Sequence, residues 1–517
     1  MNPHKPARRG IVAAGHRETA SAALEVLSLG GNAFDAAVAA MLTACVAEPV
    51  LASPGGGGFL TAHPREQSPR VYDFFAHTPR RKQHRDRLDF HPIEANFGTT
   101  RQTFHIGLGA IATPGFVSGL FAIHRDLCQL PLEALFEPAI QRARNGVTVN
   151  PFQHLINRIV APILLASPAS RALHSAPGAP DMLISQGDCH RLPDMADFLD
   201  TLQREGERFF YAGEPARNLI MDSMQNGGQL TQEDLDGYRV NVRQPLRFAY
   251  RSAELITNPL PSLGGTLIAF SLGLLDNRTE TRAGAASETE LRQLARAMRI
   301  TLAARSEQHD QLEQLLAPGA AEQYKELMQH GGLSTRGTTQ ISIADAQGNL
   351  ASLTLSNGEG CGYVIPHTGI MMNNMLGEED LNPGGFQRWT ENRRLLSMMT
   401  PTLVMSRDGD ALVTGSGGSN RIRSAILQVI LNHLDHGLSL QQAVSHPRIH
   451  YEDGQLSIEP GIDKDICRHL EDEFPQQQHW QEKSLFFGGA HSVLVDRHGG
   501  LHGAADERRG GVCLTID

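Results

Sequence analysis

Hydrophobic residues recur at helical spacing through the first part of the chain. Over residues 18–49, apolar positions three and four residues apart lie on both sides of Gly30-Gly31-Asn32, which predicts two helices joined by a glycine turn. Residues 53–75 open with a run of four glycines and continue into two apolar segments across a polar, proline-containing stretch. That pattern is typical of a tight turn followed by two strands.

The pattern changes near residue 337. Residues 115–330 are mainly helical by periodicity, with breaks at glycine and proline clusters. Three later segments each combine a strand, a polar turn containing glycine and a second strand: 341–356, 402–416 and 492–506. Antiparallel strands together with long helices predict an α+β layered architecture, not a sheet of alternating β-α-β units. Because no linker rich in Pro, Gly and Ser divides the chain, we expect one compact domain.

Composition narrows the class of partner. The 517 residues are 40% hydrophobic, and 46 Lys and Arg against 56 Asp and Glu give a net charge of -10. This length can bury a large core, and the acidic balance disfavours nucleic acid and anionic membranes as partners. No stretch reaches the roughly 18 to 20 apolar residues of a membrane helix, and the first residues lack the apolar core of a signal peptide. We therefore expect a cytoplasmic protein that acts on a small molecule.

Nothing in the sequence indicates a metal or cofactor. The six cysteines are scattered without a Cys-x-x-Cys pair or a Cys/His cluster, which argues against a zinc site and a disulfide framework. Cys361 could be a nucleophile, but a cysteine without an evident partner is more often a small packed residue. His446 and His450 are four residues apart, yet Pro447 argues against the helix that a metal pair would need.

A glycine-rich turn precedes one strongly apolar helical segment. Residues 415–419 read Gly-Ser-Gly-Gly-Ser, between a predicted strand and a predicted helix. Glycines let backbone N–H groups point toward one position, and the following helix N-terminus adds partial positive charge, which suits a developing oxyanion. Gly418 and Ser419 are the candidate donors. A turn required only for tight strand-to-helix packing would explain the same glycines.

Gly337-Thr338-Thr339 stands at the start of a predicted strand, far from either end of the chain. Inside a chain a threonine hydroxyl lacks a base, whereas an N-terminal threonine carries one in its own amine. Glycine suits a peptide bond that is to be cut there, because it tolerates a strained backbone. The alternative is that two threonines merely favour a strand. A Gly-x-Ser-x-Gly hydrolase elbow is not present in the sequence.

The chain resembles the γ-glutamyltransferase family of N-terminal-nucleophile hydrolases. Besides residues 337–356, the resemblance rests on these segments in the family's order: 23–49 with 55–60, 111–125, 209–219, 227–238, 395–404, 413–422 and 502–509. It implies a four-layer αββα sandwich made as a proenzyme. Self-cleavage would leave residues 1–337 as a large chain and 338–517 as a small chain, which together form one domain.

The resemblance also implies roles for individual residues. Thr338 matches the nucleophile whose freed amine acts as base, with cleavage between Gly337 and Thr338. Ser356 matches a hydroxyl residue that contacts that amine. Gly418 and Ser419 match a pair of glycine oxyanion donors, the second of which is serine here. The implied reaction is attack on an amide carbonyl, formation of an acyl-enzyme on Thr338, and release to water or an acceptor amine.

Departures from the family pattern concern the substrate. Phe75 stands where the family has an arginine that holds the substrate's α-carboxylate, and a phenyl ring cannot replace a bidentate charge clamp. Glu378 matches an aspartate that binds the α-amine. Of a serine pair on the carboxylate, Ser397 remains and Met398 replaces its neighbour; Met375 also replaces a polar residue. The loop between Glu378 and Ser397 is shorter than the family's lid, which predicts a more open cleft.

These observations favour a self-processing amidohydrolase without metal or organic cofactor, acting on a γ-glutamyl, glutathione-type amide or a related one. Hydrolysis is expected over transfer, because an open cleft admits water. The first alternative is an acylase on a non-γ-glutamyl amide, such as a cephalosporin-type side chain or a small amide like oxamate. The second is an unprocessed homologue that binds a ligand or partner without turnover.

Overall fold

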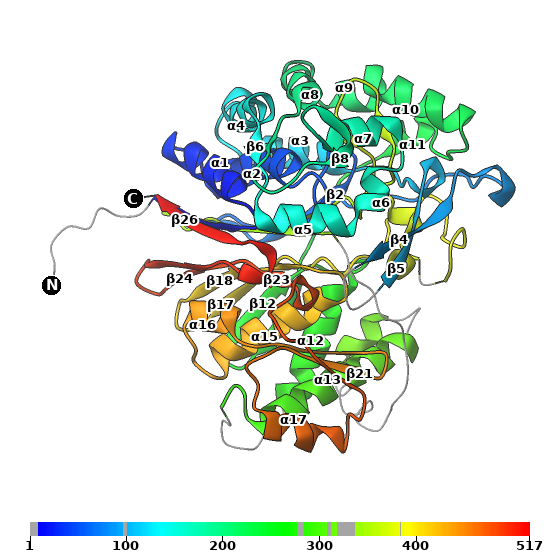
Figure 1. Ribbon diagram of the computed structural model, residues 1–517. Helices are drawn as coiled ribbons and strands as arrows, with labels where there is room; N and C mark the ends of the chain where they lie inside the picture. Colours follow the sequence, from blue (N-terminus) through cyan, green and yellow to red (C-terminus); the bar gives the residue numbers. More distant parts are fainter. Residues whose placement is uncertain are drawn as a thin grey trace.

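Two antiparallel sheets lie face to face at the centre of the computed structural model, which describes residues 9–96, 101–276, 284–307, 312–317, 337–382 and 384–516 (Figure 1). The first sheet has, in spatial order, β10 (Asn241–Arg243), β3 (Arg70–Asp73), β2 (Gly57–His63), β14 (Leu350–Ser356), β13 (Thr339–Asp345), β1 (Gly10–Ala14) and β26 (Val512–Ile516). The second has β11 (Leu246–Tyr250), β12 (Ala253–Thr257), β17 (Thr402–Ser406), β18 (Ala411–Thr414), β24 (Ser492–Val495) and β25 (Leu501–Ala504).

Helices cover the outer faces of both sheets (Figure 1). Next to the first sheet lie α1 (Arg17–Ser28), α2 (Ala33–Ala47) and α3 (Phe116–Leu127), and farther out α4 (Leu132–Asn145) packs on α2 and α8 (Pro193–Glu205) on α4. Next to the second sheet lie α12 (Leu263–Asp276), α15 (Arg421–Leu434) and α16 (Leu440–Ser445), and farther out α13 (Glu288–Glu307) packs on α12 and α17 (Lys464–Glu471) on α13. The predicted combination of helices with antiparallel strands is confirmed.

Smaller elements surround this centre. The further helices are α5 (Pro151–Ile159), α6 (Ala161–Leu164), α7 (Pro168–His174), α9 (Glu207–Ala212), α10 (Glu214–Gln225) and α11 (Gln232–Gly237). The short strands are β4 (His91–Asn96), β5 (Arg101–Ile106), β6 (Val147–Thr148), β7 (Ser175–Ala176), β8 (Ala179–Leu183), β9 (Cys189–His190), β15 (Val364–Ile365), β16 (Ile370–Met371), β19 (Ser416–Gly417), β20 (Ile449–Glu452), β21 (Gln455–Ile458), β22 (Gln477–His479) and β23 (Gly489–Ala490). No helix in the described ranges is both long and apolar enough to span a bilayer.

The two predicted N-terminal helices are α1 and α2, joined by a turn in which Gly30 has φ = 90°. Asn32 begins α2 with a capping box, because its side chain accepts from the Asp35 backbone N–H while the Asp35 carboxylate accepts from the Asn32 backbone N–H. Such a cap stabilises a helix by about 1 kcal/mol. Every residue of α2 is buried, as expected for a helix that is apolar on all sides.

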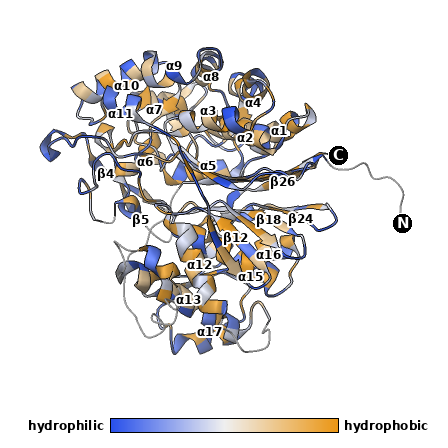
Figure 2. Ribbon diagram, turned by 180° about the vertical axis from the view of Figure 1, so that it is seen from behind, coloured by the Kyte–Doolittle hydropathy of each residue, from blue (hydrophilic) through white to orange (hydrophobic). Residues whose placement is uncertain are grey.

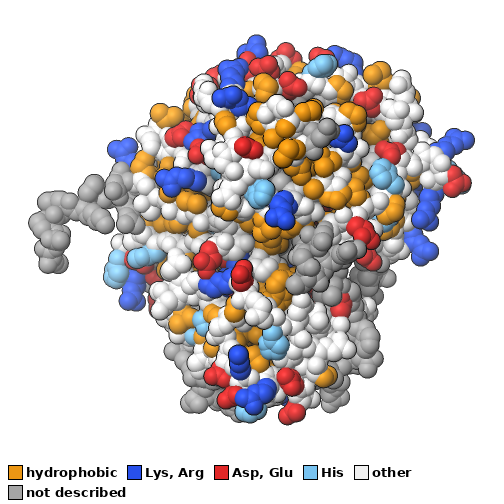
Figure 3. Space-filling view, viewed as in Figure 1, with side chains coloured by type: hydrophobic (Ala, Val, Ile, Leu, Met, Phe, Trp, Pro, Cys, Tyr) orange, Lys and Arg blue, Asp and Glu red, His pale blue; other side chains and the backbone are white. Residues whose placement is uncertain are grey.

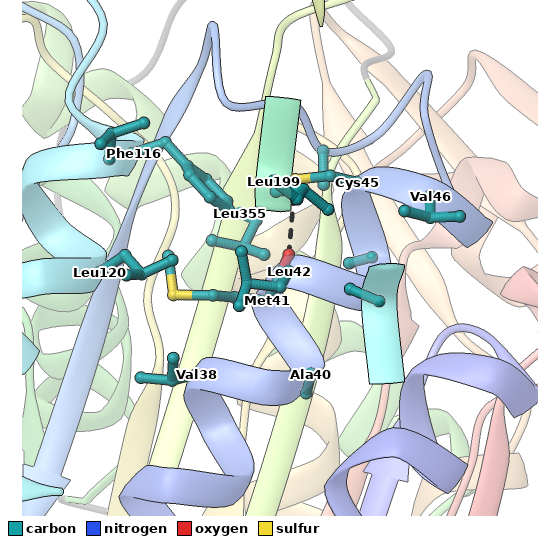
Figure 4. Close-up of a cluster of buried hydrophobic side chains, with 14 of the residues drawn as sticks. Val38, Ala40, Met41, Leu42, Cys45, Val46, Phe116, Leu120, Leu199 and Leu355 are labelled. Atoms are coloured by element: carbon teal, nitrogen blue, oxygen red, sulfur yellow. Dashed lines mark hydrogen bonds between the residues drawn. The ribbon is translucent and has the colours of Figure 1, made fainter. Parts of the chain in front are cut away.

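The core on the helical side of the first sheet is built around α2. Figure 4 shows Val38, Met41 and Leu42 of α2 among side chains of α3, α8 and β14. Hydrophobic residues occupy both sheets and the sides of the helices that face them (Figure 2). Covered by helices on one face and by the second sheet on the other, β13 and β14 are buried at every position.

The face between the sheets is apolar at one end and polar at the other. Ile11, Ala13 and Leu350 of the first sheet meet Leu403 and Val413 of the second. Farther along, hydroxyl groups of the first sheet bond to backbone carbonyls outside it: Ser342 Oγ donates to His491 O at 2.8 Å and Ser352 Oγ to Thr414 O at 2.8 Å. The buried hydroxyls are therefore satisfied.

The three predicted hairpins are present as β13–β14, β17–β18 and β24–β25. Residues 115–330 differ in part from the prediction. Most of the described residues there are helical, but β11 and β12 pair with each other, and β12 pairs with β17, so that both join the second sheet. Their alternating residues, Leu246, Phe248 and Tyr250 above all, carry a strand pattern that a mainly helical interpretation overlooked.

Candidate active site

Thr338 lies at one end of the central strands of the first sheet, where several strands begin or end together. β13 starts at the next residue, and Thr339 pairs with Leu355 near the end of β14. Ser356, the last residue of β14, pairs with Gly57 at the start of β2. Thr338 is buried, with 4% of its surface exposed. The strand order thus brings Thr338 and Ser356 to the same end of the central strands.

Both backbone polar groups of Gly337, the residue before Thr338, are hydrogen-bonded. Ser356 Oγ donates to Gly337 O at 2.9 Å, and the Gly358 backbone N–H donates to Ser356 Oγ at 3.1 Å. The Gly337 backbone N–H donates to the carboxylate oxygen Oε1 of buried Glu359 at 2.5 Å. A hydroxyl donor therefore already points at the carbonyl oxygen of the residue before Thr338.

The glycine-rich turn packs directly against Thr338. A Cβ atom on Gly417 would lie 2.1 Å from Thr338 O, so only glycine fits there. Gly418 has φ = 122° and Ser419 has φ = 55°, a left-handed conformation that is strained for serine. Ser419 Oγ donates to Asp380 Oδ2 at 2.7 Å. That bond fixes the strained residue one position before the cap of α15.

A buried arginine links Thr338 to a second loop. Arg509 Nη1 donates to Thr338 O, and Arg509 Nη2 donates to Leu485 O, each at 3.3 Å. Burial lowers the pKa of Arg509 to about 10, and the nearby Glu359 carboxylate opposes that shift. Arg509 is therefore charged at neutral pH. Its positive charge lies beside the turn that carries Gly418.

A buried carboxyl group contacts Thr339, the residue that follows Thr338. Glu48, at the end of α2, accepts hydrogen bonds from Thr19 Oγ1 at 2.8 Å and from Thr339 Oγ1 at 2.7 Å. Burial raises the pKa of Glu48 to about 7, and both hydroxyl donors oppose the shift. The start of β13 is thus anchored to α2 through a group that titrates near neutral pH.

Glu378 belongs to the same neighbourhood. Its carboxylate lies against Gly358, because a Cβ atom on Gly358 would be 2.1 Å from Glu378 Oε1. Gly358 is the residue whose N–H bonds Ser356. Two residues beyond Glu378, Asp380 accepts from Ser419. The segment that carries Glu378 therefore connects the Ser356 side of the site with the glycine-rich turn.

Phe75, Ser397 and Met398 are all buried. Phe75 is 2% exposed and stacks on Phe59 with ring centroids 5.6 Å apart. The Ser397 hydroxyl accepts from the Met399 backbone N–H at 3.0 Å, and Met398 is buried in the same apolar cluster as Phe75. Their side chains are engaged in packing and backbone contacts.

An arginine does reach the strand end that carries Phe75. Arg394 donates to Phe75 O, and its Nε lies 3.2 Å from Asp73 Oδ1. Its ring partner is Tyr238, 4.8 Å from the guanidinium carbon to the ring centroid. The Arg394 charge is thus compensated by a buried carboxylate inside the protein.

Cys361 and His450 have contacts inside the protein. Cys361 is buried, and burial raises its pKa to about 12, so that the thiol is protonated at neutral pH. His450 hydrogen-bonds Ser424 Oγ through Nδ1 and Glu452 through Nε2. Within the ranges that the structure describes, no three His, Cys, Asp or Glu side chains gather as a metal site would require.

Sequence reasoning did not identify Glu48, Glu359 or Arg509. Arg509 stands inside the recognised segment 502–509 and Glu359 lies three residues after the segment 337–356, but neither has a residue pattern that assigns it a contact. Glu48 carried a usable signal, since it is an acidic residue at the end of an otherwise apolar helix. Such a carboxylate needs buried donors, which the two threonines provide.

The chain is similar to known proteins over nearly its whole length. A glutathione hydrolase proenzyme of Escherichia coli (strain K12) is 29% identical over 97% of this chain and 91% of its own length, and an Acylase ACY 1 proenzyme of Pseudomonas sp. (strain V22) is 30% identical over 99% and 95%. A cephalosporin acylase from Bacillus halodurans has the same fold, with a TM-score of 0.85 at 22% identity, covering 99% of this chain and 98% of the other. The family model of gamma-glutamyltranspeptidase matches residues 19–516. The chain belongs to the gamma-glutamyltranspeptidase family.

Proposed function

We propose that this chain is a proenzyme that cuts itself between Gly337 and Thr338 and then hydrolyses an amide through an acyl-enzyme on Thr338. The observation that carries the proposal is the hydrogen-bonded Gly337 peptide, with Ser356 Oγ on its carbonyl oxygen and Glu359 on its N–H. The two central sheets with outer helices support assignment to the four-layer αββα sandwich of N-terminal-nucleophile hydrolases. Residues 1–337 and 338–517 would remain together as one domain.

The bond to Gly337 is broken by an acyl shift. Thr338 Oγ adds to the Gly337 carbonyl carbon, and the carbonyl oxygen gains negative charge. Ser356 Oγ is the donor placed for that charge. When the C–N bond breaks, the nitrogen of Thr338 keeps the electron pair and takes the hydroxyl proton, which leaves an ester between Gly337 and Thr338 Oγ. Water hydrolyses the ester, so a free amine and a free hydroxyl remain on Thr338.

In turnover the freed amine acts as the base, because its reference pKa of about 7.7 to 8.0 lies close to neutral pH. It accepts the Oγ proton as Thr338 attacks the substrate carbonyl. The N–H groups of Gly418 and Ser419 stabilise the oxyanion, and the positive charge of Arg509 beside that turn favours it further. When the oxyanion collapses, the amide C–N bond breaks and the leaving amine takes the proton from the Thr338 ammonium group, which leaves an ester on Thr338 Oγ. Water, deprotonated by the same amine, then hydrolyses that ester and releases the acyl group as an acid; hydrolysis is proposed over transfer.

The substrate is proposed to be a γ-glutamyl, glutathione-type amide or a related amide. The carboxylate of Glu378, against Gly358, is the group that would bind an amine on the acyl portion. The relative named glutathione hydrolase supports this choice. The metal-free and cofactor-free chemistry of an N-terminal threonine suffices for the reaction.

One observation favours the acylase alternative. Phe75, which occupies the place of a carboxylate-binding arginine, is stacked on Phe59 in the core, and Arg394 is engaged by Asp73 and Phe75 O. An acyl group without an α-carboxylate would need no clamp. The relative named Acylase ACY 1 also supports the acylase alternative.

The test is a trapped acyl-enzyme. The purified protein is mixed with a γ-glutamyl anilide or with a 4-aminobutyryl anilide, which lacks the α-carboxylate, then quenched in acid within milliseconds and weighed by mass spectrometry. The proposal predicts that the 338–517 piece gains the mass of one acyl group and that peptide mapping places it on Thr338. An adduct on any other residue, or turnover without an adduct on Thr338, would contradict the assignment. The rates at which the two anilides acylate Thr338 and release aniline are then compared. The anilide that reacts faster identifies the substrate class.

A further inference from the structure

A large cavity opens beside α5, away from the residues assigned to the reaction. Its volume is about 1240 Å³, somewhat above the roughly 300 to 1,000 Å³ of most small-molecule sites. It lies between α5, the loop that follows β22, and the turn that precedes β26. On this face of the molecule, hydrophobic side chains reach the surface around α5 (Figure 3). Thr338, Ser356 and Glu378 are not among its lining residues.

The α5 wall has one continuous face. Pro151, Phe152, Leu155, Arg158 and Ile159 line the cavity, and their spacing of three and four residues places them on one side of a helix. Leu155 leaves 44% of its surface exposed. The helix therefore presents apolar side chains and one arginine to the cavity.

The opposite wall is aromatic. Trp480 and Phe486 line the cavity, and their rings stack with centroids 4.8 Å apart and planes 28° from parallel. Arg421 lies behind, with its guanidinium carbon 4.1 Å from the centroid of Phe486. Buried contacts on the far side hold this aromatic pair in place, which gives a flat, preformed surface for another ring.

Positive charge at the cavity is available to a ligand. Lys483 is engaged by Glu507 at 2.6 Å, and Arg508 is held by buried Glu459 and Asp506. By contrast, Arg17 and Arg158 are exposed, and among the described residues neither has an ion-pair partner. A carboxylate would satisfy these guanidinium groups, because Arg presents a planar fork of donors.

We propose that this α5 cavity binds an apolar organic anion, with its apolar body against Trp480 and Phe486 and its carboxylate at Arg17 and Arg158. The cavity is coupled to the candidate active site: Leu485 lines it, and Leu485 O shares the Arg509 guanidinium with Thr338 O. Binding itself does not depend on the function proposed above.

The experiment uses the full chain with Trp389→Phe, which leaves Trp480 as the one tryptophan of the two in the sequence. Phenylbutyrate is titrated while Trp480 fluorescence is followed, and phenylbutanol serves as the uncharged probe of the same shape. We expect a saturable change with phenylbutyrate and at least about tenfold weaker binding of phenylbutanol. Arg158→Gln should weaken phenylbutyrate about tenfold, since hydrogen bonds to charged groups are worth more than neutral ones.

Arg204→Gln is the matched control, because Arg204 lies on α8, pairs with Asp200 and does not line the cavity. It should leave the dissociation constant of phenylbutyrate unchanged. Calorimetric titration of the unsubstituted protein provides the same answer if Trp389→Phe fails to fold. An absent phenylbutyrate signal in both assays, equal affinity for phenylbutanol, or an Arg158→Gln variant that binds as before would overturn the proposal. None of these readouts requires self-cleavage or turnover.

Discussion

The segment around Gly337 and the positions expected to hold a substrate headgroup differ in chemistry. Around Gly337, polar groups are paired with one another: Ser356 with Gly337 O, and Glu359 with Gly337 N–H. At the headgroup positions, Phe75 and Met398 are packed in an apolar cluster. The chain therefore retains polar contacts suited to cleavage while it lacks a charge clamp at Phe75.

This difference separates the residues proposed for the reaction from those proposed for substrate recognition. The polar contacts around Gly337 come from Ser356 at the end of β14 and from Gly358 and Glu359 in the turn after it. The headgroup positions depend on a strand end and a distant loop, joined where the Leu395 N–H donates to Ala76 O.

The largest effect is expected from Thr338→Ala. Without the hydroxyl there is no nucleophile, so the chain should stay uncut and amide hydrolysis should fall by roughly 10³-fold or more. Thr338→Ser keeps a hydroxyl and should still be cut. Denaturing mass spectrometry and an anilide assay measure both outcomes. Substantial turnover by the alanine variant would remove Thr338 from its role.

Ser356→Ala should slow self-cleavage by about 10²-fold, because one donor to the developing oxyanion is lost. Ser352→Ala is the matched control in the same strand: it removes the buried bond to Thr414 O and so lowers stability by about 1 kcal/mol. Its cleavage rate should be unchanged. Equal cleavage rates in the two variants would show that the Ser356 contact has no part in processing.

Glu48→Gln should flatten the dependence of stability on pH. The folded-state pKa of Glu48, about 7, lies above its usual value of 4.5, so its contribution is fully present below pH 4.5 and is lost as the pH rises through 7. The free energy of unfolding of the unsubstituted protein should therefore fall relative to Glu48→Gln across this window. Denaturant titrations at pH 4.5 and 8 measure the difference, and parallel pH profiles would contradict the assignment.

The smallest effect is expected when the α-carboxylate is removed from the substrate. If no arginine clamps it, a 4-aminobutyryl anilide, which lacks only that carboxylate, should lose less than tenfold in kcat/KM relative to the γ-glutamyl anilide. A bidentate arginine contact would make that loss about 10²-fold, since charge-assisted pairs are the strong hydrogen bonds. A large loss would restore a charge clamp and weaken the acylase alternative.

The sequence predicted local structure better than contacts between distant segments. The α1–α2 turn and the three hairpins follow from periodicity and glycine placement within a few residues. Arg509 could not be identified in this way, because its contact with Thr338 joins residues 171 positions apart. The burial of Phe75 against Phe59 likewise depends on how β2 and β3 pack against the second sheet.

The most direct measurement is the intact mass of freshly purified protein under denaturing conditions, followed over hours. The proposal predicts that the full chain is replaced by two pieces, residues 1–337 and residues 338–517, with Thr338 at a new N-terminus. A chain that stays whole throughout would contradict self-cleavage and favour a homologue that binds without turnover.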